Sequence, residues 1–400
     1  MYKNRSIVFI KSYRFIFLSV SLMLIFLLLF NFSGCESKEK VIKIGNQSVL
    51  SGADKFYGED QLISLSMATA ELSPVRIGGF DYRIELVTKD DEGNAEKAFL
   101  IAQEFVQENA VAVIGSTFNG TTKSSIPVYS ELNIPFITPS APGEDISGGY
   151  QNFYRMIINN SQKIENIASF LNNDVKPKKL VLIDNGEDYS VKLVDYIIEI
   201  FNNKKISFNK RYSVKFDSTD YNMLAENLLI DEPDVIFFCA KPNELADLIT
   251  KTRKLQINSR FITEEMGMEE SITDTADKTE LEGLIAIVPQ PPSLAKYTED
   301  KKSIDFWRKY TDFAAKMKPP TLSKEGPGSF APYSYDAFYV LINAMKTANS
   351  IIPEDYTIEL KKTSFAGITG QIAFNSNGDR LDPQSTEFIV KNGDWIRYSQ

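Results

Sequence analysis

The residue types that could do chemistry are few in this chain, and histidine is missing altogether. The sequence has 400 residues, no His and two cysteines, Cys35 and Cys239. Without histidine, Ser-His-Asp and Cys-His catalysis and any His-ligated zinc or haem iron are excluded. Two cysteines cannot make a cysteine-rich metal site or a disulfide framework. We therefore expect neither a metal nor another cofactor.

An acidic pair, Glu264-Glu265, is the next candidate for chemistry. Two carboxylates can act as general acid and base, but adjacent residues on a strand point to opposite faces. They would not face one scissile bond, so a glycosidase arrangement is not favoured. Such a pair is also common in a solvated acidic turn. No G-x-S-x-G nucleophile motif occurs, and we expect a protein that is not an enzyme.

The elements that must position such residues alternate regularly. Short apolar runs and longer amphipathic segments follow one another over 41–138 and again over 161–263, which predicts parallel sheets in βαβ units and two similar lobes. The segment 121–132 is expected to form one helix despite Pro127, or two short ones. Open parallel sheets bind ligands at the carboxyl ends of their strands. The informative loops therefore follow residues 46, 114, 138, 184, 239 and 263.

The loop after Ile114 is small, polar and rich in possible donors. It reads Gly115-Ser116-Thr117-Phe118-Asn119-Gly120-Thr121-Thr122 and leads into an expected helix. Free amides at a helix start attract anions, so a carboxylate could dock here, although the same residues also suit an ordinary helix cap. The loop matches neither G-x-G-x-x-G nor a Walker motif, so nucleotide binding is not indicated.

The remaining loops add groups of other kinds. Pro139-Ser140-Ala141-Pro142-Gly143 offers backbone and hydroxyl groups, and Tyr189 could either cover a ligand or pack in the core. A carboxylate at Glu264-Glu265 opposite an anion site would suit a zwitterion. Cys239 lies on an apolar strand and is expected in the core, since a free cysteine behaves as a small hydrophobe.

The amino terminus reads as a targeting segment. Residues 1–14 hold four cations, and 15–30 are uncharged and apolar. This run is shorter than the ~20 residues of a spanning helix and is typical of a secretory signal. Phe32-Ser33-Gly34-Cys35 resembles a bacterial lipobox, which implies cleavage after 1–34, a lipid on Cys35 and a tether over 35–40. An uncleaved signal anchor is the alternative, and both place the body outside the cytoplasm.

The overall charge argues against a nucleic-acid partner. The formal net charge is −9, and every charged residue before Cys35 is basic, so the body is more acidic still. Phosphate binding needs a basic surface, and no aromatic stripe alternates with basic residues here.

Short segments along the whole body together resemble a known family. In chain order they are Ile42-Lys43-Ile44-Gly45, Leu50-Ser51-Gly52, Tyr57-Gly58, Asp90-Asp91, Val113-Ile114-Gly115, Ile134 to Ala141, Asp184 to Tyr189, Tyr335-Asp336-Ala337, and Gly367 to Asp379. Their order and spacing resemble the type I periplasmic solute-binding proteins, above all the branched-chain amino-acid (leucine/isoleucine/valine) receptor family of ABC transporters in its lipoprotein form. The resemblance implies an α/β fold with two Rossmann-like lobes, parallel central sheets, three crossovers and a ligand cleft between the lobes.

The resemblance also implies domain limits and ligand contacts. Lobe 1 would comprise 41–156 plus 288–372, and lobe 2 would comprise 157–287 plus 373–400. A ligand carboxylate would be held by Asn119, Gly120 and Thr121 and by the loop of Ser140, Ala141 and Pro142. Its ammonium would be held by Glu265, and Tyr189 would close over it. Tyr57 and Phe118 would lie near its side chain.

Three positions depart from that family pattern. Asn119 stands where Ser is usual and can still donate to a carboxylate. Pro142 stands where Thr is common, and proline has neither a hydroxyl nor an N–H. Lys241 stands where an aromatic is common, and its cation could pair with Glu265 or favour a ligand with an extra negative group. We therefore expect an amino acid or a similar small amide or carboxylate.

The expected function is that of a lipid-anchored, extracytoplasmic receptor of an ABC importer, monomeric, which closes its lobes on a solute and delivers it to a membrane permease. A sensor, or a lipoprotein of the same fold that regulates an envelope enzyme, remains the alternative.

Overall fold

The computed structural model describes residues 39–215, 221–268, 272, 276–289, 301–317, 326–381 and 385–398. The chain divides into two units, 1–40 and 41–400, and the fold below is that of the second. The predicted signal segment and Cys35 lie outside the described residues. Among the helices that the structure describes, none is long and apolar enough to cross a membrane.

The first sheet holds six strands in the order β2-β3-β1-β4-β5-β6. Strands β1, β4, β5 and β6 run parallel, and β2 pairs antiparallel with β3. The bounds are β1 (Lys40–Ser48), β2 (Val75–Ile77), β3 (Phe80–Asp90), β4 (Ala112–Ile114), β5 (Phe136–Thr138) and β6 (Phe153–Arg155). The three short strands β4, β5 and β6 are fully buried, as expected for strands covered on both faces.

Three helices connect the strands of this sheet. They are α2 (Lys55–Leu72), α3 (Ala95–Gln107) and α4 (Asn119–Glu131). Helix α4 is continuous with Pro127 inside it, so the first of the two predicted alternatives holds.

The second sheet holds seven strands in the order β15-β14-β11-β10-β9-β7-β8. Strands β7 to β11 are mutually parallel, and β14 and β15 are antiparallel additions. The bounds are β7 (Leu180–Asp184), β8 (Lys210–Ser213), β9 (Val235–Cys239), β10 (Arg260–Glu264), β11 (Ile285–Pro289), β14 (Ser385–Lys391) and β15 (Asp394–Arg397). Helix α5 (Asn160–Phe170), with a π-helical turn at Leu171–Val175, precedes this sheet, and α6 (Asp188–Lys204), α7 (Tyr221–Asp231) and α8 (Pro242–Lys254) lie between its strands in the chain.

The chain passes three times between the regions of the two sheets. It leaves the first sheet after β6, returns after β11, and ends in the second sheet with β14 and β15. The returning helices are α10 (Lys301–Ala314), α11 (Ala331–Ala348) and α12 (Pro353–Leu360), followed by the small hairpin of β12 (Phe365–Gly367) and β13 (Gly370–Ile372). These three passes confirm the predicted α/β architecture with parallel central sheets joined by crossovers.

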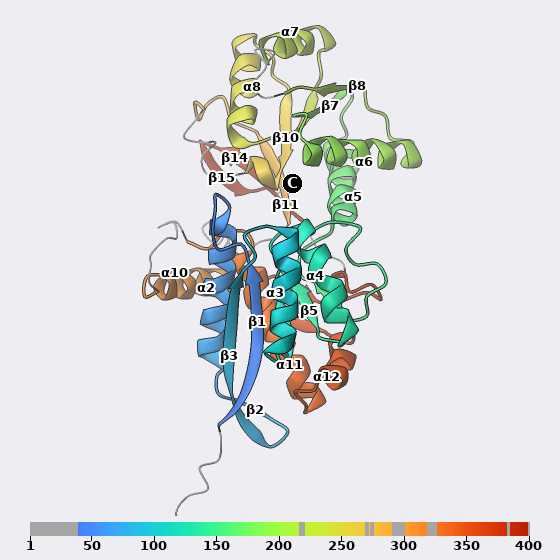
Figure 1. The fold of residues 1–400 in the computed structure, drawn as a ribbon. Coiled ribbons are helices and arrows are strands. Elements are labelled where there is room, and N and C mark those ends of the chain that lie inside the picture. The colour runs from blue at the N-terminus through green and yellow to red at the C-terminus, as the bar shows by residue number, and fades with distance from the viewer. Residues whose placement is uncertain are drawn as a thin grey trace, which may run out of the picture. The chain divides into compact units, whose positions relative to one another are not determined.

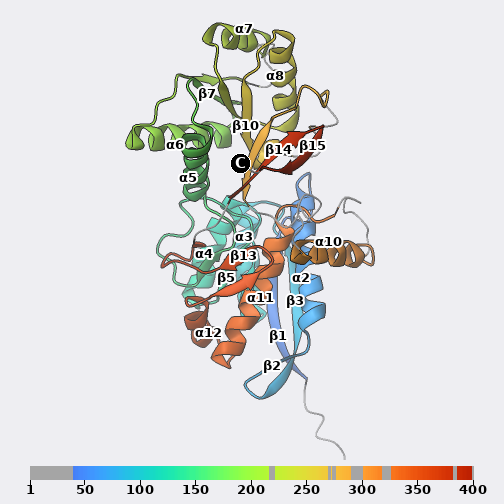
Figure 2. The same cartoon turned by 180° about the vertical axis from the view of Figure 1, so that it is seen from behind.

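Helices cover both faces of the first sheet. Figures 1 and 2 show α3 and α4 on one face and α11 with α12 on the other. On the second face, Phe306 of α10 and Phe338 of α11 share a buried apolar cluster with Ile42 and Ile44 of β1. A sheet covered in this way leaves its strand ends and loops as the places where polar side chains can meet a ligand.

Candidate ligand-binding site

Two predicted loops, after β4 and after β5, are joined into one surface. The side-chain Oδ1 of Asn119 accepts a hydrogen bond from the Gly143 amide at 2.9 Å. The Ser140 hydroxyl donates to the Thr117 carbonyl at 2.8 Å. Asn119 is the first residue of α4, and Phe118 precedes the helix in an extended conformation. Of the Asn/Thr helix cap named as the alternative for this loop, Asn119 takes no part, because its side chain bonds to the neighbouring loop, whereas Thr121 Oγ1 accepts from the Phe118 amide at 3.3 Å.

The hydroxyls of this surface are turned inward. Thr121 Oγ1 lies 2.7 Å from Ser116 Oγ and 3.0 Å from the Phe118 carbonyl oxygen. Ser140 is 4% exposed. Ala141 is fully buried, and its amide donates a hydrogen bond to Thr138 Oγ1. Asn119 and Gly120 are exposed. The loops thus present mainly the first turn of α4 outward, where helix geometry leaves amides without intrahelical partners.

A buried carboxyl, Asp91, supports this loop from within. Ser116 Oγ donates to Asp91 Oδ2, and the Gly93 amide donates to its Oδ1 at 3.0 Å. Burial raises the pKa of Asp91, and these donated hydrogen bonds oppose the rise. Asp91 therefore holds the loop after β4 against the end of β3.

Aromatic side chains lie beside the joined loops. The ring of Tyr57, from α2, is 6.3 Å from that of Phe118 in an edge-on arrangement and 5.6 Å from that of Phe330. All three residues are partly exposed. The sequence pointed to Tyr57 and Phe118 but not to Phe330, which comes from the segment before α11, more than 200 residues further along the chain.

Three predicted residues from the region of the second sheet, Tyr189, Glu264 and Glu265, meet around a lysine. Lys163 Nζ, from α5, donates to Glu264 Oε2 at 2.6 Å, to Glu265 Oε1 at 2.7 Å and to the Tyr189 hydroxyl at 2.5 Å. The Tyr189 hydroxyl donates in turn to Glu264 Oε2 at 3.2 Å. We name Lys163, Tyr189, Glu264 and Glu265 the lysine cluster.

The prediction that Glu264 and Glu265 point to opposite faces is wrong. Strand β10 ends at Glu264, and Glu265 begins a 3₁₀ turn that extends to Gly267. The alternation of a strand does not continue into such a turn, so both carboxylates reach the same ammonium. Glu264 is fully buried and is not part of a solvated turn.

Burial and charge oppose each other in the lysine cluster. The side chains of Lys163 and Glu264 are 5% and 0% exposed, whereas that of Glu265 is 39% exposed. Burial disfavours the charge of Lys163, but the carboxylates of Glu264 and Glu265 outweigh it and hold the pKa of Lys163 well above its ordinary value. Burial, and then the charge of Glu264, raise the pKa of Tyr189 well above its ordinary value. The cluster is therefore an ammonium surrounded by acceptors and a neutral phenol.

Lys241 does not join the lysine cluster. Its ammonium pairs with Glu187, and its backbone amide donates to Glu244 Oε2 at 2.9 Å. The cation that contacts Glu265 is that of Lys163 instead.

The start of α5 connects the joined loops with the lysine cluster. The Asn160 amide donates to the Pro142 carbonyl at 3.1 Å, and the Ser161 amide donates to Glu144. Lys163 follows two residues later. Helix α5 therefore contacts the joined loops with its first residues and the lysine cluster through Lys163.

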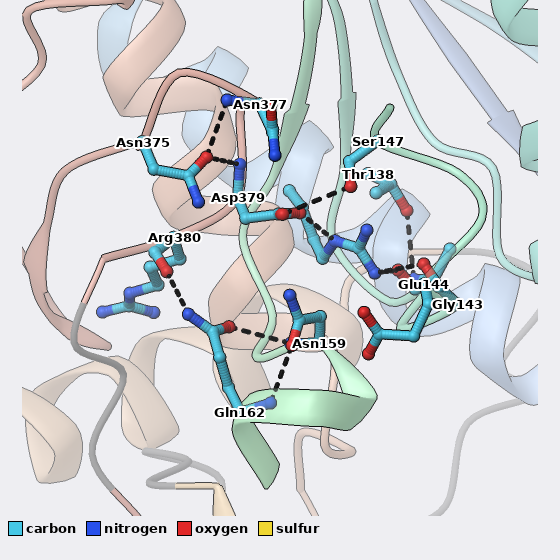
Figure 3. A network of polar contacts seen from close by, with 12 residues as sticks. Thr138, Gly143, Glu144, Ser147, Asn159, Gln162, Asn375, Asn377, Asp379 and Arg380 are labelled. Atoms are coloured by element: carbon cyan, nitrogen blue, oxygen red, sulfur yellow. Dashed lines mark hydrogen bonds and ion pairs between the residues drawn. The ribbon is translucent and has the colours of Figure 1, made fainter. Parts of the chain in front are cut away.

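A buried arginine holds the loop after β5 from behind. Arg155 donates from Nη1 to the carbonyls of Ala141 and Gly143 at 3.1 and 2.8 Å, and from Nε to Asp379 at 2.9 Å. Figure 3 shows Asp379 in the turn after Asn375, with Ser147 donating to it at 3.2 Å. The same segment meets α5, where Gln162 donates to the Arg380 carbonyl at 2.8 Å. Two of the three passes between the sheets are thus tied to the joined loops.

One feature of the sequence indicates that Lys163 is a buried residue with a charged partner. Lys163, Ile164, Ile167, Ala168 and Phe170 form the buried face of α5, so the lysine lies on an apolar helical stripe. A lysine in such a place needs a buried acceptor. Arg155 and Phe330 gave no comparable sign, because each lies in a short segment without periodicity. Among the described residues, no group of three or more His, Cys, Asp or Glu is placed to hold a metal ion.

A family model and a curated relative both match nearly the whole body of the chain. A family model described as periplasmic binding protein matches residues 41–392. The leucine-, isoleucine-, valine-, threonine- and alanine-binding protein of Pseudomonas aeruginosa is 22% identical over 350 residues, which cover 87% of this chain and 89% of that protein.

Solved structures agree in fold. The branched-chain amino acid transporter substrate-binding protein LivJ of Streptococcus pneumoniae, in complex with isoleucine, has a TM-score of 0.69 at 20% identity and covers 90% of this chain and 100% of that one. A solute-binding protein of an R. palustris ABC transporter, in complex with benzoate, has a TM-score of 0.67 at 17% identity and covers 90% and 96%. Since the family model spans nearly the whole compact unit, the chain belongs to the periplasmic binding protein family.

Proposed function

We propose that this protein is the substrate-binding component of an ABC importer and binds a small organic solute between its two lobes. The observation that carries the proposal is the joined surface of the loops after β4 and β5, with the start of α5 hydrogen-bonded to it. Loops at the carboxyl ends of parallel strands are where such sheets take ligands. The family membership and the solutes named for its relatives support the same role.

The two lobes would follow the predicted limits. Lobe 1 comprises 41–156 plus 288–372, and lobe 2 comprises 157–287 plus 373–400. The solute lies near Tyr57, Phe118, Asn119, Gly120, Thr121, Ser140 and Ala141 on the first lobe, and near Tyr189, Lys241 and Glu265 on the second. Closure of the lobes around it would be a hinge motion about the three passes of the chain, and the closed form would present both lobes to a membrane permease.

The anchor belongs to the same proposal. Residues 1–34 direct export, and Cys35 carries a lipid that keeps the receptor at the outer face of a bacterial membrane. An anchored receptor stays close to its permease, which raises its effective concentration there.

Thermal shift of residues 36–400 tests the proposed function, because this segment contains the whole compact unit. The protein is unfolded and refolded to remove any bound solute. It is then mixed with the common amino acids, small amides, aromatic and aliphatic carboxylates and nucleosides. A compound at 100 times its Kd adds about 2.7 kcal/mol to the free energy of unfolding, which a melting curve resolves. A response to a small solute supports the proposal, and no response to any compound contradicts it.

A matched pair of tyrosine variants separates site binding from general effects. Tyr57→Ala removes a ring beside the joined loops and is expected to weaken binding about tenfold. Tyr196→Ala removes a ring from the exposed side of α6, where 41% of the residue is accessible, and is expected to leave binding unchanged. Equal loss in the two variants would contradict the placement of the site.

A further inference from the structure

Four large apolar side chains are exposed at the end of the first sheet where its parallel strands begin. Phe80 opens β3 directly after the Gly78-Gly79 turn and is 52% exposed. Leu132, which follows α4, is also 52% exposed. Ile352, just before α12, and Ile358, within it, are 55% and 54% exposed. We name these four residues the amino-end surface.

Hydrogen bonds and topology place the four residues at the same end of the sheet. Helix α4 joins the parallel strands β4 and β5, so it ends where β5 begins. The Gly78 amide donates to Asn349 Oδ1 at 2.9 Å, which joins the turn before β3 to the end of α11 and so to the segment of Ile352. The Tyr356 hydroxyl of α12 donates to the carbonyl of Val111, which directly precedes β4. Figures 1 and 2 both show β2, α12 and one end of α11 at this end of the sheet.

The proposed lipid anchor is attached to the chain close to this surface. Strand β1 begins at Lys40 and ends beside the end of β3, where the Asp91 amide donates to the Ser48 carbonyl at 3.0 Å. The two strands are therefore parallel, and β1 begins at the end of the sheet where β3 begins. From Cys35 to Val41 the chain extends at most about 21 Å, at about 3.5 Å per residue. The bilayer that holds the anchor is thus within reach of the amino-end surface.

Resting on the lipid anchor of the proposed function, we infer that the amino-end surface is a membrane-contact surface whose apolar side chains enter the interface of the bilayer that carries Cys35. Exposed apolar side chains grouped in one area mark a surface that contacts protein or membrane, and the anchor supplies the membrane. Charge is not the attraction, because Arg76 pairs with Asp81 and Lys362 with Glu359. The ligand loops follow the other end of the nine-residue β1, about 30 Å along the strand from this surface.

Spin labels on the full-length protein test the inference. The protein is expressed in a bacterium, its lipid is verified by mass spectrometry, and it is reconstituted into vesicles of phosphatidylcholine. Phe80→Cys and Ile352→Cys carry labels on the amino-end surface. Ile230→Cys, on α7 and 79% exposed, is the control. Cys239 does not compete for the label because it is fully buried, and an acylated Cys35 has no free thiol.

The readout compares collisions of each label with oxygen, which concentrates in lipid, and with a water-soluble nickel complex. The oxygen-to-nickel ratio is expected to be at least about threefold higher at 80 and 352 than at 230, as for side chains about 5–10 Å into the interface. Equal ratios at the three positions overturn the inference. Labels at 80 and 352 that are shielded from both reagents also overturn it, because protein and not lipid would then cover the surface. Protein without the lipid removes the premise and overturns it too, whereas the solute panel on residues 36–400 still tests the receptor role.

A matched pair of double variants tests whether the apolar side chains cause the contact. The label is placed at Ile358→Cys. Phe80→Ser with Ile352→Ser is expected to remove at least about half of its preference for oxygen, since apolar area drives such partitioning. Met223→Ser with Ile230→Ser, on α7 and 55% and 79% exposed in the wild type, should leave the preference unchanged. An unchanged preference in the folded Phe80 and Ile352 variant would show that the tether alone brings this end to the lipid, which overturns the membrane-contact surface.

Discussion

Lys163 Nζ and Glu264 Oε2 are 2.6 Å apart, and both side chains are withdrawn from solvent although the residues lie 101 positions apart in the chain. The pair joins the first turn of α5 to the end of β10 and so ties a helix to the sheet that it covers. A buried ion pair contributes little net stability, but removal of one partner is costly because the other remains charged.

Replacement of Lys163 by Met should therefore destabilise the protein strongly. We expect the free energy of unfolding in urea to fall by about 3–5 kcal/mol, and Lys163→Met with Glu264→Gln to recover much of this. Lys204→Met is the matched control, since both partners of its ion pair are about half exposed, and it should change stability by about 0–1 kcal/mol. Equal effects of the two lysine variants would contradict the buried pair.

Asp60 should make stability fall with rising pH. Burial raises its pKa from an ordinary 3.8 to about 6, while hydrogen bonds from Tyr310 and the Gly328 amide oppose the rise. Between about pH 4 and 6 the folded protein holds a proton that the unfolded chain releases, so the free energy of unfolding decreases as pH rises through this window. The decrease due to Asp60 is about 3 kcal/mol.

The measurement for Asp60 is urea unfolding of the wild type and of Asp60→Asn from pH 4 to 7.5. The amide cannot ionise, so the free energy of unfolding of the variant should rise relative to that of the wild type as pH rises. The expected relative increase is the amount given above. A difference between the two proteins that stays constant with pH would show that Asp60 is not the titrating group.

Asp379→Asn should loosen the loop after β5. The variant removes the charge that faces buried Arg155, whose guanidinium holds the carbonyls of Ala141 and Gly143. We expect a loss of about 3 kcal/mol in stability and faster amide hydrogen exchange over 139–147. Asp145 lies in the same loop and forms an exposed ion pair with Lys123 of α4, so Asp145→Asn serves as the control. Exchange that is equally fast in both variants would mean that Arg155 does not position the loop.

Cys239 should be unreactive in the folded protein. It is fully buried, as the sequence predicted, and burial raises the pKa of its thiol well above its ordinary value. A thiol reagent added to residues 36–400 is expected to react with less than a tenth of the molecules until urea unfolds the chain. Rapid labelling under native conditions would contradict the buried position.

Lipid attachment at Cys35 remains a prediction, because the residue lies outside the described part of the chain. The full-length protein expressed in a bacterium should incorporate a labelled fatty acid, and Cys35→Ser should abolish the label. Label retained in the variant would exclude Cys35 as the acceptor.

Much of the fold followed from periodicity within single segments. The alternation of apolar runs with amphipathic segments over 41–138 and 161–263 predicted parallel sheets, and the structure has such strands and helices there, for example β9 and α8. Helix α12, which has eight residues, and strand β11 lie outside the two segments in which this alternation was found.

The sequence by itself indicated the loops where a ligand site is expected, since the loops that follow parallel strands are read directly from the order of the elements. Only the tertiary structure decided which charged side chains meet beside these loops. The partners of Lys163 lie 101 and 102 residues away, and Asp379 lies 224 residues from Arg155. Such charge pairs depend on which distant segments pack together, and local periodicity carries no information about that choice.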